Sequence, residues 1–370
     1  MSFDLGAVIR SEVAAIRAYH VAVPPGAPAR IKLDANESPF ALGDAMREAL
    51  AAEVEKALAD VEFHRYPDPE ARDLRQLLAH DLSVEPEQIL VSNGSDEAIQ
   101  MLLLAVGGPG VAVASPVPTF VMYEIGARIQ GLRFLGHPLS EQFDLDVVSF
   151  CDLLRVERPR LVFLAWPNNP TGVLYGAAVI EEILNVCTGN GCNALVVVDE
   201  AYVHFSGESF LPRLNAYPNL VILRTLSKIG LAGIRLGMLV ASPAVAREIN
   251  KVRQPYNVNA LTQAAARVML RHPDIASRHA AAIVKERERM RVRLRDLPGI
   301  TLYPSRTNFF LIRTARPGDE VFRGLFERGI QVRNFSQAPY LADCLRVTIG
   351  TPEENKALLD ALAAVLGQGR

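Results

Sequence analysis

The sequence turns from apolar to polar in the same way at two places, Leu195-Val-Val-Val-Asp-Glu-Ala-Tyr202 and Leu220-Val-Ile-Leu-Arg-Thr-Leu-Ser-Lys228. Each stretch begins with four apolar residues, which is typical of a strand that is buried on both faces of a sheet. The polar residues that follow would stand at the carboxyl end of that strand. Because ligands of parallel sheets bind beyond the carboxyl ends of the strands, both segments are candidates for a binding site.

Three more apolar runs of strand length occur in the middle of the sequence: Val111–Ala114, Leu161–Ala165 and Gly237–Ala241. Longer segments, such as Ala177–Thr188, carry apolar residues at helical spacing and separate these runs. The alternation of strands and helices predicts an α/β fold, with a mainly parallel sheet that helices cover.

The pattern changes after Val258. Two long helical patterns, Ala260–Leu270 and Ala276–Leu297, open this part of the chain. The strands expected after them are Gly299–Tyr303, Phe309–Arg313, Gln331–Val332 and Leu345–Ile349, and the expected helices are Asp319–Arg328 and Pro352–Leu366. This mixture predicts a smaller α+β domain. We therefore expect a large domain over residues 36–258, and a small domain that combines residues 1–35, with a helical start at Ser2–Tyr19, and residues 259–370.

The composition excludes several classes of protein. Of the 370 residues, 49% are hydrophobic and 22% are charged, which is enough apolar material for a large core and argues against disorder. Lys and Arg number 39 and Asp and Glu number 41, so the formal net charge is −2. A chain so close to neutral has no general electrostatic attraction to nucleic acid or to an anionic membrane.

Other features of the sequence favour a cytoplasmic protein without metal. Charged residues interrupt the first 20 positions, which leaves no apolar core of a signal peptide. The longest uncharged stretch, residues 98–123, is divided by Gly107-Gly-Pro-Gly110 and so cannot form one membrane helix. The 4 cysteines are too few for a disulfide scaffold, and the 7 histidines show no paired spacing, so we predict no metal site.

The polar residues at the predicted strand ends suit one ligand. Lys228 could form a Schiff base with an aldehyde if its charge is suppressed. Asp199 could keep a pyridine nitrogen protonated, Asn169 and Tyr202 could bind a ring oxygen, and Phe120 could stack on the ring. Pyridoxal 5′-phosphate has all of these groups, and a lysine and an acid are the chief contributions of proteins that bind it.

A phosphate group would also find partners in these segments. Thr225 and Ser227 lie in the polar part of the second stretch and Arg235 follows it, and an arginine can bind phosphate through two hydrogen bonds. Gly94 and Ser95 lie in Val91-Ser-Asn-Gly-Ser-Asp-Glu-Ala-Ile99, which has the pattern of a strand, a polar turn and the start of a helix. The free backbone N–H groups at such a helix start bind anions.

Each of these residues also has an ordinary structural explanation. Lys228 taken alone would be a surface lysine, and Asp199 could be the N-cap of a helix. Asn169, which precedes a proline, could belong to a simple turn. Arg346 lies within an apolar run and could form a structural salt bridge. The functional interpretation therefore rests on the residues as a set.

The set resembles a known family. Asn168-Asn-Pro-Thr-Gly172, Asp199-Glu-Ala-Tyr202 and the segment Ser227–Arg235 closely resemble fold-type-I pyridoxal-phosphate aminotransferases, and the last segment is most similar to the histidinol-phosphate aminotransferase family. Further matches to that family are Leu33-Asp-Ala-Asn-Glu37, Arg65-Tyr-Pro-Asp68, Asn93-Gly-Ser-Asp-Glu97 and Leu345-Arg-Val-Thr-Ile-Gly-Thr351. The resemblance implies a large domain with a mainly parallel seven-stranded sheet between helices, and a smaller α+β domain.

The resemblance also implies a role for each matching residue. Lys228 would carry the cofactor and move a proton, Asp199 would pair with the ring nitrogen, and Asn169 and Tyr202 would contact the ring hydroxyl. The phosphate would be held by Gly94, Ser95, Thr225, Ser227 and Arg235. The substrate would be bound by Asn36, Tyr66, Arg333 and Arg346, with Tyr66 reaching the cofactor of the neighbouring subunit of a homodimer.

Several alternatives stay open. An aromatic amino-acid aminotransferase or a decarboxylase of threonine phosphate could share this scaffold. A dinucleotide dehydrogenase would need G-x-G-x-x-G after a strand, which the sequence lacks. Phe120, Ser38 and Trp166 depart from the pattern of the family and could tune the choice of substrate. The expected reaction transfers the amino group of histidinol phosphate to 2-oxoglutarate in a ping-pong sequence.

Overall fold

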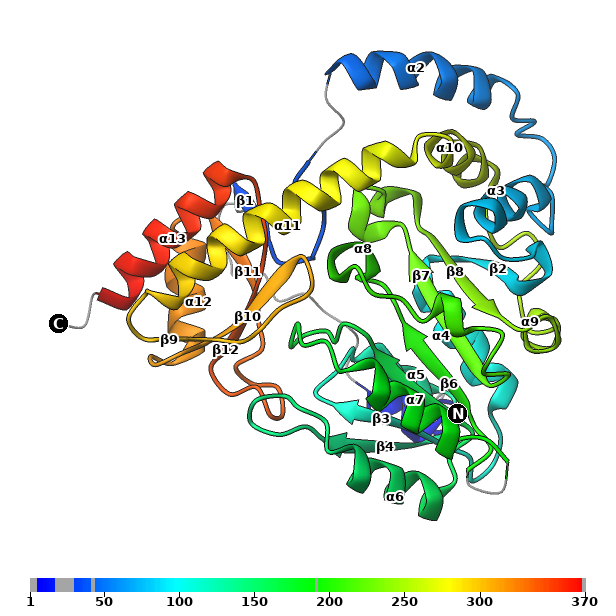
Figure 1. Ribbon diagram of the computed structural model, residues 1–370, viewed down its shortest axis with the longest axis horizontal. Coiled ribbons are helices and arrows are strands. Elements are labelled where there is room, and N and C mark those ends of the chain that lie inside the picture. The colour runs from blue at the N-terminus through cyan, green and yellow to red at the C-terminus, as the bar shows by residue number, and fades with distance from the viewer. Residues whose placement is uncertain (1–4, 17–29, 41–43, 190–191, 368–370) are drawn as a thin grey trace.

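The computed structural model describes residues 5–16, 30–40, 44–189 and 192–367. Within these ranges the strands form a seven-stranded and a five-stranded sheet. Figure 1 shows the two sheets side by side, with the long helix α11 (Pro273–Arg295) running from one to the other. No helix among the described residues combines the length and the apolar character that a membrane span needs.

The seven-stranded sheet is mainly parallel, as predicted. Its strand order is β2-β8-β7-β6-β5-β3-β4, and only β8 runs antiparallel to its neighbours. The bounds are β2 Ile89–Asn93, β3 Ala112–Val117, β4 Arg133–Pro138, β5 Leu161–Ala165, β6 Leu195–Asp199, β7 Leu220–Thr225 and β8 Leu236–Ala241. The carboxyl ends of β2, β5, β6 and β7 therefore share one edge, because all four point the same way.

The five-stranded sheet joins the two ends of the chain. Its order is β1-β11-β12-β10-β9, and β1 pairs in parallel with β11 while the other pairs are antiparallel. The bounds are β1 Ile31–Leu33, β9 Ile300–Leu302, β10 Phe309–Thr314, β11 Ile330–Asn334 and β12 Cys344–Thr348. The four predicted strands of this part are present, with ends shifted by a few residues.

Helices cover the sheets and connect successive strands. They are α2 Asp44–Ala59, α3 Arg72–Leu82, α4 Gly94–Val106, α5 Met122–Ile129, α6 Val147–Glu157, α7 Ala177–Val186, α8 Val203–Ser206, α9 Pro243–Asn250, α10 Ala260–Leu270, α12 Gly318–Glu327 and α13 Pro352–Gly367. The helix α10 packs against α2 and α3, beside the larger sheet, whereas α11 contacts α8, β9 and α13. The division of the chain at residues 35 and 258 stays a prediction.

The prediction of a helical start over Ser2–Tyr19 is only partly right. The described part of this segment holds a 3-10 turn, η1 (Leu5–Ala7), and a short helix, α1 (Ser11–Ala14), while residues 2–4 and 17–19 lie outside the described residues. The helix α1 packs on α5, and Arg10 donates a hydrogen bond to the carbonyl of Ile129 at 2.5 Å. The turn and the helix are too short to bury an apolar face of their own.

Candidate active site

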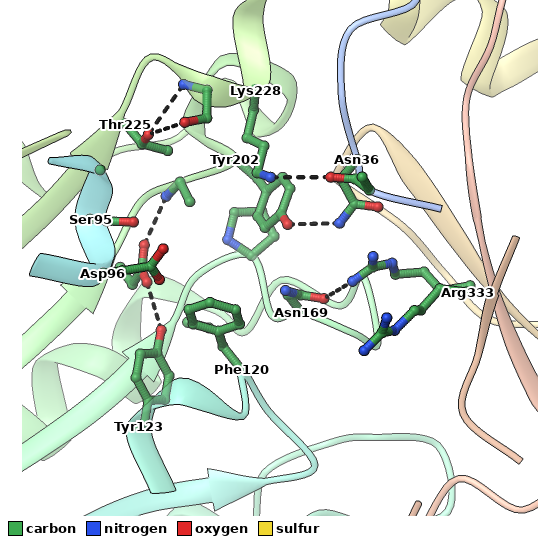
Figure 2. A pocket seen from close by; sticks show the side chains of 18 of the residues that line it. Asn36, Ser95, Asp96, Phe120, Tyr123, Asn169, Tyr202, Thr225, Lys228 and Arg333 are labelled. Carbon is green, nitrogen blue, oxygen red and sulfur yellow. Dashed lines mark hydrogen bonds between the residues drawn. The ribbon is translucent and has the colours of Figure 1, made fainter. Parts of the chain in front are cut away.

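A pocket opens at the carboxyl edge of the larger sheet and reaches the smaller sheet (Figure 2). It brings together every predicted site residue except Tyr66. Those that line it are Asn36, Gly94, Ser95, Phe120, Asn169, Asp199, Tyr202, Thr225, Ser227, Lys228, Arg235, Arg333 and Arg346. Segments that lie far apart in the sequence meet here because the strands β2, β5, β6 and β7 end side by side.

Lys228 extends into the pocket from the 3-10 turn that follows β7. Its Nζ donates a hydrogen bond to the carbonyl of Ala35 at 3.3 Å (Figure 2). Burial, followed by the positive charge of Arg346, lowers the pKa of Lys228 to about 8. A larger share of this amine is therefore neutral near pH 8 than of an ordinary lysine, and a neutral amine can attack an aldehyde.

Asp199 ends β6 and lies at the bottom of the pocket, with 4% of its surface exposed. Its Oδ2 accepts a hydrogen bond from the hydroxyl of Tyr123 at 2.7 Å, and its Oδ1 accepts one from the backbone N–H of Ala201 at 3.1 Å. Burial raises the pKa of Asp199 to about 6, and the hydrogen bonds from Tyr123 and Ala201 oppose this rise. The carboxylate is therefore mostly ionised at neutral pH and attracts a positive group in the pocket.

Tyr123 is a pocket residue that the sequence analysis missed. It lies in the first turn of α5 and is fully buried, where its ring stacks on Phe163 at 4.5 Å and meets the edge of Phe120 at 5.6 Å. The only signal in the sequence is its spacing of three residues from Phe120, which itself lies just before the helix begins. That spacing does not reveal which side faces the pocket.

The predicted anion site is a tight contact between α4 and the start of β8. Gly94 begins α4 with φ +69°, and a Cβ there would lie 2.7 Å from Nη2 of Arg235. A Cβ on Gly237 would lie 2.3 Å from the carbonyl carbon of Gly94. Thr225 donates to Ser227 Oγ at 2.9 Å beside them. The backbone N–H groups, two hydroxyls and a guanidinium thus gather where a phosphate would be neutralised.

Asn169 and Tyr202 are oriented as hydrogen-bond donors. Oδ1 of Asn169 accepts from Nη1 of Arg346 at 2.7 Å, which leaves the amide hydrogens of Asn169 for the pocket. Nδ2 of Asn36 donates to the Tyr202 hydroxyl oxygen at 2.8 Å, so the phenol proton points elsewhere (Figure 2). Burial raises the pKa of Tyr202 to about 12, which keeps this proton in place. Two donors of this kind suit an anionic ring oxygen.

Arg333 and Arg346 project from the smaller sheet toward the same pocket. They are direct partners in the antiparallel pairing of β11 and β12. Nη2 of Arg346 donates to the carbonyl of Asp34 at 2.6 Å, and its guanidinium carbon lies 5.6 Å from the ring centre of Phe335. Like charges in opposed positions of a sheet repel each other, so this pair favours an anionic ligand.

Tyr66 and two of the residues that depart from the family pattern lie outside the pocket. Tyr66 is 79% exposed and stacks on Tyr256 at 4.5 Å, outside the pocket of its own chain. Trp166 is buried, and its indole N–H donates to the carbonyl of Tyr175 at 2.8 Å, so it packs behind the pocket wall. Ser38 also lies outside the lining. Of the three departures from the family pattern, Phe120 is the one that faces the pocket.

Comparisons with known proteins show the family of the chain. The family model described as aminotransferase class I and II matches residues 28–362. Histidinol-phosphate aminotransferase 2 of Nitrosococcus oceani is 46% identical over 359 residues, which are 96% of this chain and 96% of that protein. Histidinol-phosphate aminotransferase 1 of Ralstonia nicotianae is 43% identical and covers 98% of this chain and 95% of its own.

A solved structure has the same fold. Histidinol-phosphate aminotransferase of Sinorhizobium meliloti, in complex with pyridoxal-5′-phosphate, matches the chain with a TM-score of 0.84 at 24% sequence identity. The match covers 99% of this chain and 99% of that structure, so both sheets belong to the shared fold.

Proposed function

The chain belongs to the class I and II aminotransferase family, and on that premise we propose that it transfers the amino group of histidinol phosphate to 2-oxoglutarate, with pyridoxal 5′-phosphate as its cofactor. The products of the proposed reaction are imidazole-acetol phosphate and glutamate, and the reaction belongs to histidine biosynthesis. The observation that carries the proposal is the pair Arg333 and Arg346, which faces the pocket that also contains Lys228.

The residues of the pocket fit the cofactor. Gly94 and Gly237 carry no side chain where α4 begins, so a phosphate could approach the backbone beside Arg235, which pairs with Asp96 at 3.4 Å. The buried carboxylate of Asp199 suits a protonated ring nitrogen, and the donors Asn169 and Tyr202 suit the ring oxygen. When bound, pyridoxal 5′-phosphate supplies a ring that accepts electrons and stabilises negative charge at the α-carbon of the substrate.

The protein contributes proton transfer and orientation. The Lys228 amine, with a pKa of about 8, would serve as the base that takes a proton from the substrate α-carbon and as the acid that returns it. Asp199 holds a proton on the ring nitrogen through its negative charge, and Tyr123 fixes the direction of that carboxylate. Phe120 lines the cavity, where its ring could stack on the ring of the cofactor.

The same two arginines would serve both substrates. The donor brings a phosphate dianion and the acceptor brings two carboxylates, and Arg333 and Arg346 offer two guanidinium groups in opposed positions. Asn36 lies next to them, where its carbonyl accepts from Asn308 at 3.0 Å and its backbone N–H donates to Thr348 at 3.0 Å. One pocket that receives two anionic substrates in turn supports a ping-pong order.

We also propose a homodimer in the cytoplasm. Tyr66 lies on a loop and is exposed to solvent. This position suits a residue that completes the cofactor site of a second subunit. The four cysteines are buried free thiols, which is the usual state in a reducing compartment. The small-molecule substrates are polar and need neither a membrane nor a nucleic acid.

The test is a product assay with the purified protein and pyridoxal 5′-phosphate. Histidinol phosphate and 2-oxoglutarate together should yield glutamate, at a higher kcat/KM than phenylalanine or tyrosine as donor. Faster reaction with the aromatic amino acids would make the chain an aromatic aminotransferase. Release of carbon dioxide from threonine phosphate without 2-oxoglutarate would make it a decarboxylase.

A further inference from the structure

Tyr66 and Tyr256 form a stacked pair on the outside of the molecule. Their ring centres lie 4.5 Å apart at an interplanar angle of 20°, and their exposed fractions are 79% and 39%. Tyr256 has φ +57°, a backbone conformation that residues other than glycine rarely adopt. Two exposed rings held together at an uncommon backbone angle indicate a built surface rather than a free loop.

Arg253 connects the two loops that carry this pair. Its side chain is only 7% exposed. Nη1 donates to the carbonyl of Pro69 at 2.8 Å, and Nη2 pairs with Glu70 at 2.9 Å, on the loop of Tyr66. Nε donates to Asn250 at 2.7 Å and Nη1 to Oδ1 of Asn257 at 3.1 Å, on the segment of Tyr256. One guanidinium thus fixes both loops through four hydrogen bonds, a geometry that a lysine cannot copy.

Asn257 continues this network to the phosphate site. Its Nδ2 donates to Glu97 at 2.8 Å and to the carbonyl of Val91 at 3.0 Å. Glu97 in turn accepts from the backbone N–H of Asn93 at 2.6 Å, one residue before Gly94. The outward-facing pair and the anion site of the same chain are therefore parts of one hydrogen-bonded unit.

We propose that Arg253 is a positioning residue that acts across the subunit boundary. It holds the Tyr66–Tyr256 pair of one subunit where Tyr66 reaches the cofactor phosphate of the other. This inference rests on the proposed homodimer with shared sites. Arg253 does not line the pocket, and its four hydrogen bonds all go to groups of its own chain, so we assign it no direct contact with substrate or cofactor.

Hybrid dimers separate an effect on the partner from an effect within one chain. Subunits of Arg253→Met and Lys228→Ala are coexpressed with different affinity tags, and the mixed dimer is purified. Its one competent site is built around the intact Lys228 of the Arg253→Met subunit. That site receives Tyr66 from the Lys228→Ala subunit, in which Arg253 is intact. The readouts are the dissociation constant of pyridoxal 5′-phosphate at that site and the turnover per dimer.

We expect the Arg253→Met homodimer to bind the cofactor at least about tenfold more weakly, as the loss of charged hydrogen bonds predicts. The mixed dimer should recover normal affinity at one site and about half of the wild-type turnover. Arg247→Met is the matched control, because Arg247 lies on the neighbouring helix, is 73% exposed and contacts only Glu248 among the described residues, at 3.9 Å. This control should keep the wild-type affinity.

A mixed dimer that binds the cofactor as weakly as the Arg253→Met homodimer would overturn the proposal, because Arg253 would then act within its own chain. A mixed dimer of Tyr66→Phe and Lys228→Ala tests the shared site separately, and a failure there would reject the proposed dimer instead. If Arg253→Met does not fold, Arg253→Lys and Tyr256→Leu are taken through the same scheme. The mixed dimer of either variant with Lys228→Ala should bind the cofactor with normal affinity. If neither mixed dimer does, the proposal is overturned.

Discussion

Arg333 and Arg346 are direct partners across the antiparallel strands β11 and β12, and both face the pocket that contains Lys228. Aromatic rings partly offset their mutual repulsion. The Phe335 ring centre lies 5.8 Å from the guanidinium carbon of Arg333 and 5.6 Å from that of Arg346. The pair is therefore assembled before any anion arrives, so that less of the binding energy goes into ordering it.

This pair predicts how the protein distinguishes phosphorylated donors. Arg333→Met should raise the KM for histidinol phosphate by roughly 10- to 100-fold, since it removes charged hydrogen bonds to the phosphate. The KM for unphosphorylated histidinol should change little. Steady-state kinetics with the two donors checks the prediction, with Arg323→Met as the control because Arg323 lies exposed on α12. Equal losses for both donors would contradict it.

The Tyr123–Asp199 hydrogen bond predicts a pH dependence of cofactor binding. The Asp199 pKa of about 6 lies above the ordinary value of 3.8, so the carboxylate becomes protonated as the pH falls through about 6. Affinity for a cofactor with a protonated ring nitrogen should fall with it. Tyr123→Phe removes a donor that lowers this pKa, and so should move the fall to higher pH.

Titration of the dissociation constant against pH measures this shift. Tyr175→Phe is the matched control, because Tyr175 is buried outside the pocket and its hydroxyl has no hydrogen-bond partner among the described residues. A pH profile that is the same in Tyr123→Phe and in the wild type would show that Tyr123 does not act on Asp199.

The lowered pKa of Lys228 predicts how the rate of cofactor incorporation depends on pH. With a pKa of about 8, the neutral fraction of the amine is one half at that pH and approaches its maximum about one pH unit above it. The rate of formation of the yellow Schiff base from the cofactor-free protein should follow this curve. A lysine with its ordinary pKa of 10.5 would keep gaining rate well above pH 9. Lys228→Ala should abolish the absorbance band, and a band that persists would reject the assignment.

The close packing at Gly237 predicts that a larger residue at this position disturbs the phosphate site. Gly237→Ala places a methyl group 2.3 Å from the carbonyl carbon of Gly94, against backbone that cannot swing aside. It should lower the free energy of unfolding by about 1–3 kcal/mol and weaken cofactor binding. Gly233→Ala is the control, since a Cβ there meets no atom within 4 Å. Denaturant unfolding gives the free energy of unfolding of both variants. Equal values would show that a methyl group fits between residues 237 and 94.

Much of the site is predictable because it follows buried strands directly. Asp199 ends β6 and Lys228 lies just past β7, so a continuous apolar run and the next polar residue locate them. Strand β4 gave no such signal, since it lies at the edge of the sheet and its residues are half-buried or exposed. A strand of that kind has no uninterrupted apolar run.

Other relationships depend on packing that no local pattern encodes. Tyr123 reaches Asp199 because of the angle at which α5 packs on the sheet, and its spacing from Phe120 is silent about that angle. The opposition of Arg333 and Arg346 is set by the register between β11 and β12. The proposed role of Tyr66 depends on a second subunit. Tyr66 and both arginines are predictable only through resemblance to the family, and their geometry comes from the fold.

The most direct test of the central claim is the pattern of initial velocities. Histidinol phosphate is varied at several fixed concentrations of 2-oxoglutarate, and glutamate formation is followed. If one pocket with Arg333 and Arg346 receives the two substrates in turn, double-reciprocal plots should give parallel lines. Lines that intersect to the left of the axis would mean that both substrates are bound together, and would contradict the account.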